Sequence, residues 1–494
     1  MDAATPDHLR PPEPLTPGDL RSIFVGVMLA LFLSALDQTI VATAMPTVGR
    51  DLGDVQHLPW VVTAYLIAST AATPLYGKFS DMHGRRVTML IAIGVFLVGS
   101  VVCALAPTML LLVAGRALQG LGGGGLMALS QTIIADLVSP RERGRYQGYF
   151  GTVFATSSLL GPLLGGFFAE SLHWSLIFWI NLPLGALALW LVNARLKKLP
   201  VMHRRHRLDG LGALLLVGAT MSLMLALSWG GSEHPWTSPP ILGLVALSAV
   251  LWAGFGRRMG RAPEPLIPLA ILRDRVVRTA TAAGALAMGT YIGLTIFVPI
   301  YYELSLGLTA RESGAALIPV MIGVVLGATV SGRTMAVVRH YKRIPLCGLT
   351  VSVLALGTVA ATAGTLPSWA LITLLGLSSV GLGSLLPVAT VSVQNAVDPG
   401  HLGTATATMN FCRQLGGALL VAAFGALVLG GGSVHGLSPD SFVRGGADLS
   451  ASFGRLFWAA TAGLAGSLAF LVSMEERPLR ERRATAPAED QAAS

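Results

Sequence analysis

Charged residues are scarce in this chain. Asp, Glu, Lys and Arg make up 12% of its 494 residues, and hydrophobic residues make up 53%. A soluble globular chain is about 25% charged. The composition therefore excludes an ordinary soluble domain and predicts a protein that crosses a membrane many times.

Cysteine is equally rare. Cys103, Cys347 and Cys412 all lie in apolar runs, and none of them belongs to a CxxC or Cys/His pattern. Such spacing supports neither a disulfide framework nor a metal site. We expect no metal and no other cofactor.

Motifs for catalysis and phosphate binding are missing too. The chain has no HExxH or GxSxG, and Gly77-Lys78 lacks the flanking Gly and Ser or Thr of a phosphate-binding loop. Gly120-x-Gly122-x-x-Gly125 fits the dinucleotide pattern, but it lies in an apolar run with no strand before it. These glycines are better explained by close packing of membrane helices. The sequence does not predict an enzyme.

Positive charge is dispersed along the chain. The net charge of +9 could suggest nucleic acid, but the Lys and Arg are scattered over short links between apolar runs, so no nucleic-acid partner is expected. They gather in alternate links, which places both termini in the cytoplasm by the positive-inside rule. The apolar windows predict an all-α polytopic membrane protein of fourteen spans, near residues 23–48, 58–79, 87–106, 108–136, 145–169, 174–195, 209–229, 239–256, 278–303, 312–335, 344–363, 368–393, 402–429 and 454–473.

An internal repeat divides the chain. ADLVSPRERG at 135–144 matches QNAVDPGHLG at 394–403, and the same offset aligns further glycines. We therefore expect two six-helix halves, at residues 23–200 and 278–474. Parallel repeats of this kind form transporters with a substrate site between the halves.

The remaining segments lie outside this repeat. Residues 201–277 are predicted to hold two inserted spans with basic flanking loops. The proline-rich residues 1–22 are expected to form a disordered cytoplasmic tail, and residues 475–494 a second tail. The Arg-rich, Ala- and Gly-rich composition indicates a bacterial cytoplasmic membrane protein.

Two charges lie deep inside predicted spans. Asp37 is fifteen residues past Ser22, about 22 Å along a helix, which is too deep for its side chain to reach the surface. A carboxylate there costs about 2.5 to 3.5 kcal/mol on insertion scales, and it predicts a proton or cation site. Arg116 lies at a similar depth, and a pair with Asp37 would relieve both desolvation costs. A purely structural arginine is the alternative.

Six motifs occur in a fixed order. They are LDQTIVATAMP (36–46), GKFSDMHGRR (77–86), LVAGRALQGLGGGG (112–125), SLLGPLLGG (158–166), YYELSLGLTARESGAALIP (301–319) and NFCRQLGGALLVA (410–422). With these motifs the chain resembles the fourteen-span drug:proton antiporter branch of the major facilitator superfamily, the group of the EmrB and QacA multidrug exporters. The resemblance implies the major facilitator fold and associates Arg116, with Asp37, with proton coupling.

The resemblance also implies a conformational latch in the loop after the second span. This loop is expected to hold the two halves together when the outer side is closed, and Asp81 can meet a helix N-terminus or Arg85. The predicted latch residues are Gly77, Asp81, Gly84, Arg85 and Arg86.

Gly161-Pro162 and Gly165-Gly166 correspond to the antiporter signature of the family. Pro162 removes a backbone donor and the glycines remove side-chain bulk, so a bend and a close helix contact are expected here.

Four polar residues are candidates for the substrate cavity: Gln38, Gln119, Glu303 and Arg413. Arg413 is predicted near mid-membrane. Glu303 ends a span where relatives commonly carry glutamine, and an interfacial carboxylate with no role in recognition remains the alternative for it.

The sequence thus predicts a monomeric exporter that moves lipophilic or amphipathic drugs or antibiotics across the bilayer in exchange for protons, by alternating access. Uptake or export of an endogenous small solute on the same fold is the main alternative. A membrane sensor or scaffold that transports nothing is less well supported, because it would not need Asp37 and Arg116 at matching depth.

Overall fold

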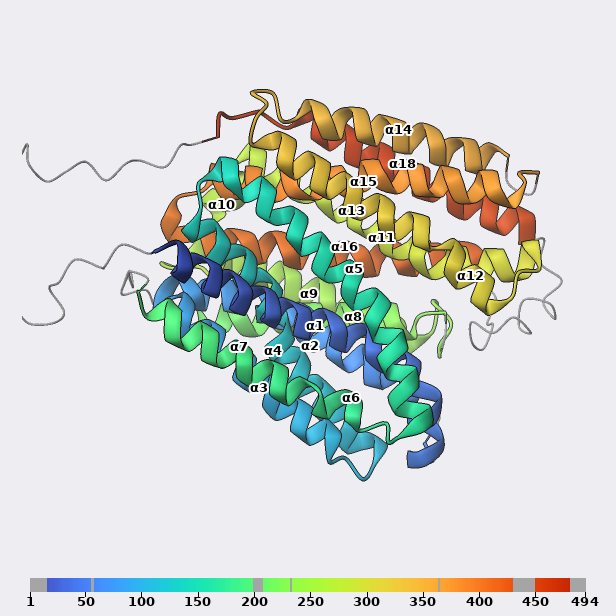
Figure 1. Cartoon of the computed structure of the whole chain (residues 1–494), viewed down its shortest axis with the longest axis horizontal. Coiled ribbons are helices and arrows are strands. Elements are labelled where there is room, and N and C mark those ends of the chain that lie inside the picture. The colour runs from blue at the N-terminus through green and yellow to red at the C-terminus, as the bar shows by residue number, and fades with distance from the viewer. Residues whose placement is uncertain are drawn as a thin grey trace, which may run out of the picture.

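The computed structural model describes residues 16–54, 57–198, 208–231, 233–362, 365–429 and 449–479. Nearly all of them lie in helices (Figure 1). In chain order these are α1 (Pro17–Leu52), α2 (Leu58–His83), α3 (Arg85–Ala104), α4 (Met109–Leu137), α5 (Pro140–Ser171), α6 (Leu176–Trp179), α7 (Asn181–Arg195), η2 (Leu196–Lys198), α8 (Gly210–Trp229), α9 (Pro239–Arg261), α10 (Leu269–Arg273), α11 (Arg275–Leu306), α12 (Ala310–Ala316), α13 (Ile318–Met335), α14 (Arg343–Ala361), α15 (Ser368–Ala396), η3 (Pro399–His401), α16 (Leu402–Leu429) and α18 (Leu449–Ser473).

In the described part of the chain, fourteen segments are long and apolar enough to cross a membrane, which confirms the predicted number of spans. Two of them contain an interruption. The sixth span joins α6 to α7 over Leu176–Arg195, and the tenth runs over Arg311–Met335 and includes α13. All spans are helical because a lipid-exposed backbone must satisfy its hydrogen bonds within the segment.

The spans form two bundles that lie side by side in Figure 1. In the first half, α1 packs on α5 and α7, while α2 and α3 pack on α4. In the second half, α13 and α14 pack on α15, and α11 packs on α16 and α18. The halves meet along two seams, α2 against α16 and α5 against α13.

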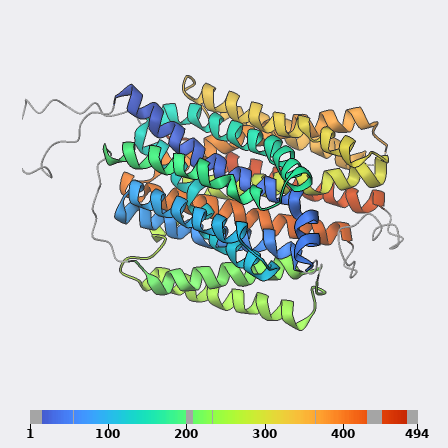
Figure 2. The ribbon, with the colours of Figure 1, turned by 60° about the horizontal axis from the view of Figure 1, so that its bottom comes forward.

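The inserted helices α8 and α9 pack on each other outside the two bundles (Figure 2). They also contact both halves. Trp229 stacks edge-on against Trp60 of α2 with ring centroids 5.5 Å apart, and Trp252 lies 6.2 Å from Phe411 of α16. The inserted pair therefore covers the seam between α2 and α16.

One end of the molecule is called the basic end here. It is the end at which the links α2–α3 and α4–α5 lie, and it corresponds to the predicted cytoplasmic side. The helix ends that flank these links carry Lys78, Arg85, Arg86, Arg141 and Arg143.

Residues 16–22 were predicted to be part of a disordered tail, but they are ordered. A capping box of Thr16 and Asp19 starts α1 at Pro17, and Asp19 pairs with Arg195 at 3.0 Å, so residues 16–22 are helix and cap rather than tail. A capped, charge-paired turn is stable where proline content alone suggests disorder. Residues 1–15 lie outside the described residues.

The chain after the last span is likewise held in place. Glu476 accepts a hydrogen bond from the Lys342 backbone N–H at 3.1 Å, and Arg477 pairs with Asp274 at 2.8 Å. Residues 475–479 therefore pack on the second half, whereas residues 480–494 lie outside the described residues.

Candidate functional site

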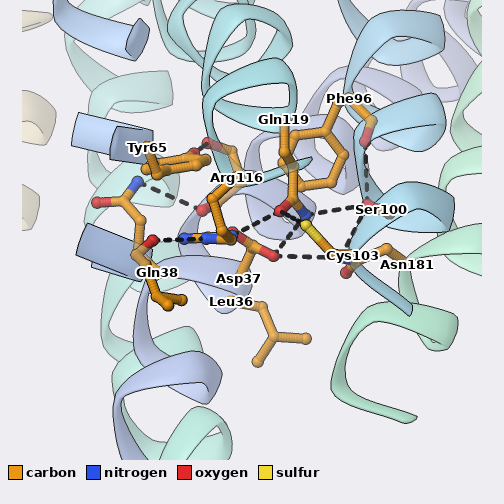
Figure 3. A network of polar contacts seen from close by, with 12 residues as sticks. Leu36, Asp37, Gln38, Tyr65, Phe96, Ser100, Cys103, Arg116, Gln119 and Asn181 are labelled. Atoms are coloured by element: carbon orange, nitrogen blue, oxygen red, sulfur yellow. Dashed lines mark hydrogen bonds and ion pairs between the residues drawn. The ribbon is translucent and has the colours of Figure 1, made fainter. Parts of the chain in front are cut away.

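A buried ion pair lies at the centre of the first half (Figure 3). Arg116 Nη1 donates to Asp37 Oδ2 at 2.5 Å, and the side chains are 1% and 0% exposed. The predicted pair between the first and fourth spans is thus confirmed. An ion pair away from water is stable only if further hydrogen bonds satisfy its remaining polar atoms.

Amide side chains supply those hydrogen bonds. Gln119 Nε2 donates to Asp37 Oδ1 at 2.7 Å, and Gln119 Oε1 accepts from Arg116 Nη1 at 2.6 Å. Asn181 Nδ2 donates to the same Asp37 Oδ1 at 3.2 Å. Gln119 was expected to line the substrate cavity, but it is fully buried inside this network. The two charges use both ends of its amide, and its expected place in a substrate cavity stays a prediction.

The guanidinium is also held by α2. Arg116 Nε donates to the Val61 carbonyl at 3.0 Å, and the guanidinium carbon lies 4.4 Å from the ring centre of Tyr65. The Tyr65 hydroxyl lies 3.1 Å from Ser34 Oγ, back on α1. The ion pair therefore joins α1, α2 and α4 and, through Asn181, α7.

Glycines bring these helices close enough for the network to form. A Cβ on Gly120 would meet the backbone of Tyr65, and a Cβ on Gly124 would meet the backbone of Ser69. Close packing of the membrane helices, predicted for this glycine run, is confirmed.

Asn181, Ser100 and Tyr65 belong to the network but are not predicted from the sequence. Gln119 Nε2 and Asn181 Nδ2 donate to Ser100 Oγ at 2.9 and 3.3 Å. The only sequence signal was an isolated amide, hydroxyl or phenol within an apolar run. Such residues are common in membrane helices, where they also bond neighbouring backbone or other helices.

A second cluster joins the two halves at the basic end. Asp81, near the end of α2, accepts hydrogen bonds from the backbone N–H groups of Gly403 and Thr404 at 3.0 and 2.7 Å. Arg85 donates to Asp81 at 2.5 Å and to Asp136 of α4 at 2.7 Å. Asp81 was expected to meet a helix N-terminus or Arg85, and it meets both.

Of the other predicted latch residues, the two glycines shape the backbone at the basic end, whereas Arg86 bonds within the first half. A Cβ on Gly77 would meet Ala407 and the Gly403 carbonyl of α16, so Gly77 allows the two halves to touch. Gly84 has a φ of 87° and allows the tight link between α2 and α3. Arg86, however, donates to Asn193 at 2.6 Å, within the first half. Among the described residues Arg86 makes no hydrogen bond or ion pair across the seam, and its expected place in the latch stays a prediction.

These contacts close the basic end. Gly144 of α5 and Gly332 of α13 approach so closely that a Cβ on either would meet the carbonyl of the other, and Asn410 donates to Gln131 at 2.9 Å. The latch was expected to act when the opposite, outer side is closed. In this structure Asp81 ties the halves at the basic end, because it lies where α2 reaches the start of α16. Its action when the outer side is closed stays a prediction.

The antiporter signature packs on α1. A Cβ on Gly161 would meet Thr39, and a Cβ on Gly165 would meet Thr43 and the Ile40 carbonyl. No described residue lies within 4 Å of a Cβ placed on Gly166, so the expected close contact is wrong for this residue. Pro162 is exposed and lies within one continuous helix.

The remaining cavity candidates do not join the ion pair. Gln38 is exposed and donates to the Ser34 carbonyl at 3.3 Å. Glu303 is half-buried and accepts from Ser313 at 2.7 Å. Arg413 is 6% exposed and donates to Thr390 and the Leu386 carbonyl, and no described carboxylate pairs with it.

Comparison with known proteins gives consistent relatives. The sequence profile described as Major Facilitator Superfamily matches residues 27–421. "Multidrug resistance protein 3" of Bacillus subtilis (strain 168) is 38% identical over 410 residues, which are 82% of this chain and 79% of that protein. "Efflux pump FUS6" of Gibberella moniliformis is 34% identical, over 80% of this chain and 71% of that protein.

Solved structures share the fold at low sequence identity. The human organic anion transporter MFSD10 (TETRAN) superposes with a TM-score of 0.64 and 18% identity, covering 93% of this chain and 100% of that one. The proton:xylose symporter XylE superposes with a TM-score of 0.63 and 16% identity, covering 93% and 96% of the two chains.

Proposed function

Because this chain belongs to the Major Facilitator Superfamily, we propose that it exports lipophilic or amphipathic drugs or antibiotics in exchange for protons. Relatives named as a multidrug resistance protein and an efflux pump support the export of drugs. The proposed setting is the cytoplasmic membrane of a bacterium, with the chain acting as a monomer on small molecules and with no nucleic-acid partner.

The observation that carries the proposal is the buried pair of Asp37 and Arg116. With Asp37 ionised, the pair has no net charge. When Asp37 takes up a proton, Arg116 is left as an uncompensated buried cation, which is costly away from water. Protonation therefore favours a different arrangement of α1, α2 and α4, and this difference is what a proton-driven cycle requires.

A proton gradient supplies enough free energy to drive drug export. One proton that enters down 100 mV supplies about 2.3 kcal/mol. One or two protons per cycle can therefore sustain a substantial outward gradient of a neutral or monocationic compound.

The latch at the basic end suggests how access alternates. We place the basic end in the cytoplasm. For a drug to enter from there, α2 must separate from α16 and α5 from α13, which breaks the bonds of Asp81 to Gly403 and Thr404. Proton release from Asp37, inside the first half, to the cytoplasm would accompany that opening, and the drug would then enter between the halves.

Efflux from energised cells tests the proposal. Cells that express the chain are loaded with a panel of antibiotics and dyes, and efflux is followed before and after a protonophore is added. We expect efflux above that of cells carrying Asp37→Asn, and we expect the protonophore to abolish the difference. Accumulation of a compound driven by the same gradient would instead indicate uptake of a solute.

A further inference from the structure

Asn181 occupies a special position in the buried network. It is the first residue of α7 and is fully buried, and its Nδ2 donates to Asp37 and to Ser100 (Figure 3). Its Oδ1 is buried too, and no hydrogen-bond partner for it is found among the described residues. Most buried polar side-chain atoms have a partner, so this oxygen requires an explanation.

The groups around Asp37 suit a carboxylate and not an acid. Arg116 donates to Oδ2, whereas Gln119 and Asn181 both donate to Oδ1. A protonated carboxyl group carries an O–H donor and needs an acceptor. The proton would sit on Oδ1, because Oδ2 faces the guanidinium, and there it would meet two donors.

Only one of the two amides is free to turn. The oxygen of Gln119 accepts from Arg116 at 2.6 Å, so turning this amide would point its NH₂ at a cation. The Asn181 oxygen has no hydrogen-bond partner in the described part of the chain, and turning that amide gives up only the 3.2 Å and 3.3 Å contacts of its NH₂. Ser100 keeps its bonds to Gln119 and to the Phe96 carbonyl.

We propose that Asn181 is a positioning residue that senses the protonation state of Asp37. Its NH₂ donates to Asp37 when the carboxylate is ionised. When a proton binds to Asp37 Oδ1, the amide turns and its oxygen accepts that O–H. No proton moves onto Asn181, so the charge change stays on Asp37 and Arg116.

Few other charged or titratable groups face this site. Tyr65 of α2, Cys103 of α3 and Arg116 of α4 interact electrostatically around Asp37. From α6 the aromatic ring of Phe178 faces Arg116, and α7 brings the amide of Asn181. α5 packs on α1 through glycines facing Thr39, Ile40 and Thr43. A neutral amide is therefore the group best placed to follow the proton.

The inference rests on the proposed proton site at Asp37, but its test does not need transport. The wild-type protein and variants are purified, placed in lipid bilayers and titrated with acid while the C=O stretch of protonated carboxyl groups is recorded by infrared spectroscopy. Subtracting the spectrum of Asp37→Asn isolates the band of Asp37. The pH midpoint of this band is the measured quantity.

Asn181→Leu removes both functions of the amide at nearly constant volume. The acid then has no acceptor, whereas the carboxylate keeps Arg116 and Gln119, so we expect the midpoint to fall by about one pH unit, the size of one lost buried hydrogen bond. Asn181→Ser retains a hydroxyl that can donate or accept, and it should restore the midpoint toward the wild-type value. Asn181→Ala gives the same sign as Asn181→Leu if the leucine variant does not fold.

Other roles of Asn181 predict other shifts of the pH midpoint. A fixed donor that only stabilises the carboxylate predicts that the midpoint rises in Asn181→Leu, and a residue that only packs predicts no shift. Either result overturns the inference while leaving the proton site intact. If Asp37 of the wild-type protein does not titrate at all, the proposed proton site fails together with the inference.

Discussion

Asp81 of the first half accepts two hydrogen bonds from Thr404 of the second half, one from its backbone N–H and one from its hydroxyl, each at 2.7 Å. A carboxylate at a helix N-terminus interacts favourably with the unpaired N–H groups and the helix dipole. The start of α16 is thus capped by an acid that lies more than 300 residues earlier in the chain. Because this cap joins the two halves, we expect it to break when the basic end opens.

Asp81→Asn should therefore favour opening of the basic end. The amide keeps the shape but loses the charge that meets α16 and Arg85, and a cap of this kind is worth about 0.5 to 2 kcal/mol. We expect a roughly 2- to 30-fold shift toward the open state and a lower turnover with little change in drug affinity. Transport and binding of one dye, measured on the same reconstituted protein, check this. Unchanged turnover with weakened binding would assign Asp81 to recognition instead.

Gly77→Ala tests the close approach of α2 and α16. The new methyl group would meet Ala407 and the backbone of Gly403, and overpacking of this kind costs about 1 to 3 kcal/mol. Gly94→Ala on α3 is the matched control, because nothing lies within 4 Å of its Cβ position.

The readout for Gly77→Ala is the distance between spin labels at two exposed positions, His83 and Val337, in a cysteine-free background. We expect a longer distance population in Gly77→Ala and none in Gly94→Ala. Equal distributions in both variants would contradict a closed seam at Gly77.

Substitution by alanine should have different effects at Gly165 and Gly166, two neighbouring glycines of the antiporter signature. Gly165→Ala places a methyl group against Thr43 and the Ile40 carbonyl, which must push α5 from α1, whereas Gly166→Ala meets nothing within 4 Å. We expect Gly165→Ala to lower thermal stability and efflux, and Gly166→Ala to leave both near the wild-type values. Melting temperature in detergent and dye efflux from cells provide the comparison. A loss of equal size in both variants would count against the packing explanation.

Asp37→Asn should leave the chain inserted but remove proton coupling. The amide retains the shape and can still accept from Arg116, but it cannot bind a proton, and Arg116 loses its counter-charge. Vesicles with an imposed proton gradient should show no gradient-driven drug movement, while dye binding remains measurable. Wild-type exchange in this variant would remove Asp37 from the coupling mechanism.

Glu303→Gln should not separate cationic from neutral drugs. Glu303 lies at the end of α11 away from the basic end and accepts a hydrogen bond from the Ser313 hydroxyl. A glutamine side chain can accept the same hydrogen bond. Resistance to a cationic dye and to a neutral antibiotic, in one host with matched expression, should stay equal to wild type. A loss confined to the cation would show that this carboxylate takes part in recognition.

Much of the architecture follows from the sequence. The spans could be counted because each needs about 20 apolar residues in helical form. The rise per residue of an α-helix gave the depths of Asp37 and Arg116 in the membrane. Because two opposite charges lie at one depth, a contact between them was predicted. The motif order indicated the family.

The arrangement of side chains around each helix was decided by the tertiary structure. Hydropathy gives the depth of a residue but not the direction in which it points, since most faces of a buried membrane helix are apolar. For this reason the bonds of Gln119 to the ion pair were not predicted, Gly166 was grouped with Gly165, and Asn181 was missed. Asp37, Arg116 and Asn181 come together only because three separate helices pack with their polar groups inward, and Asp81 finds its partner only when the two halves meet.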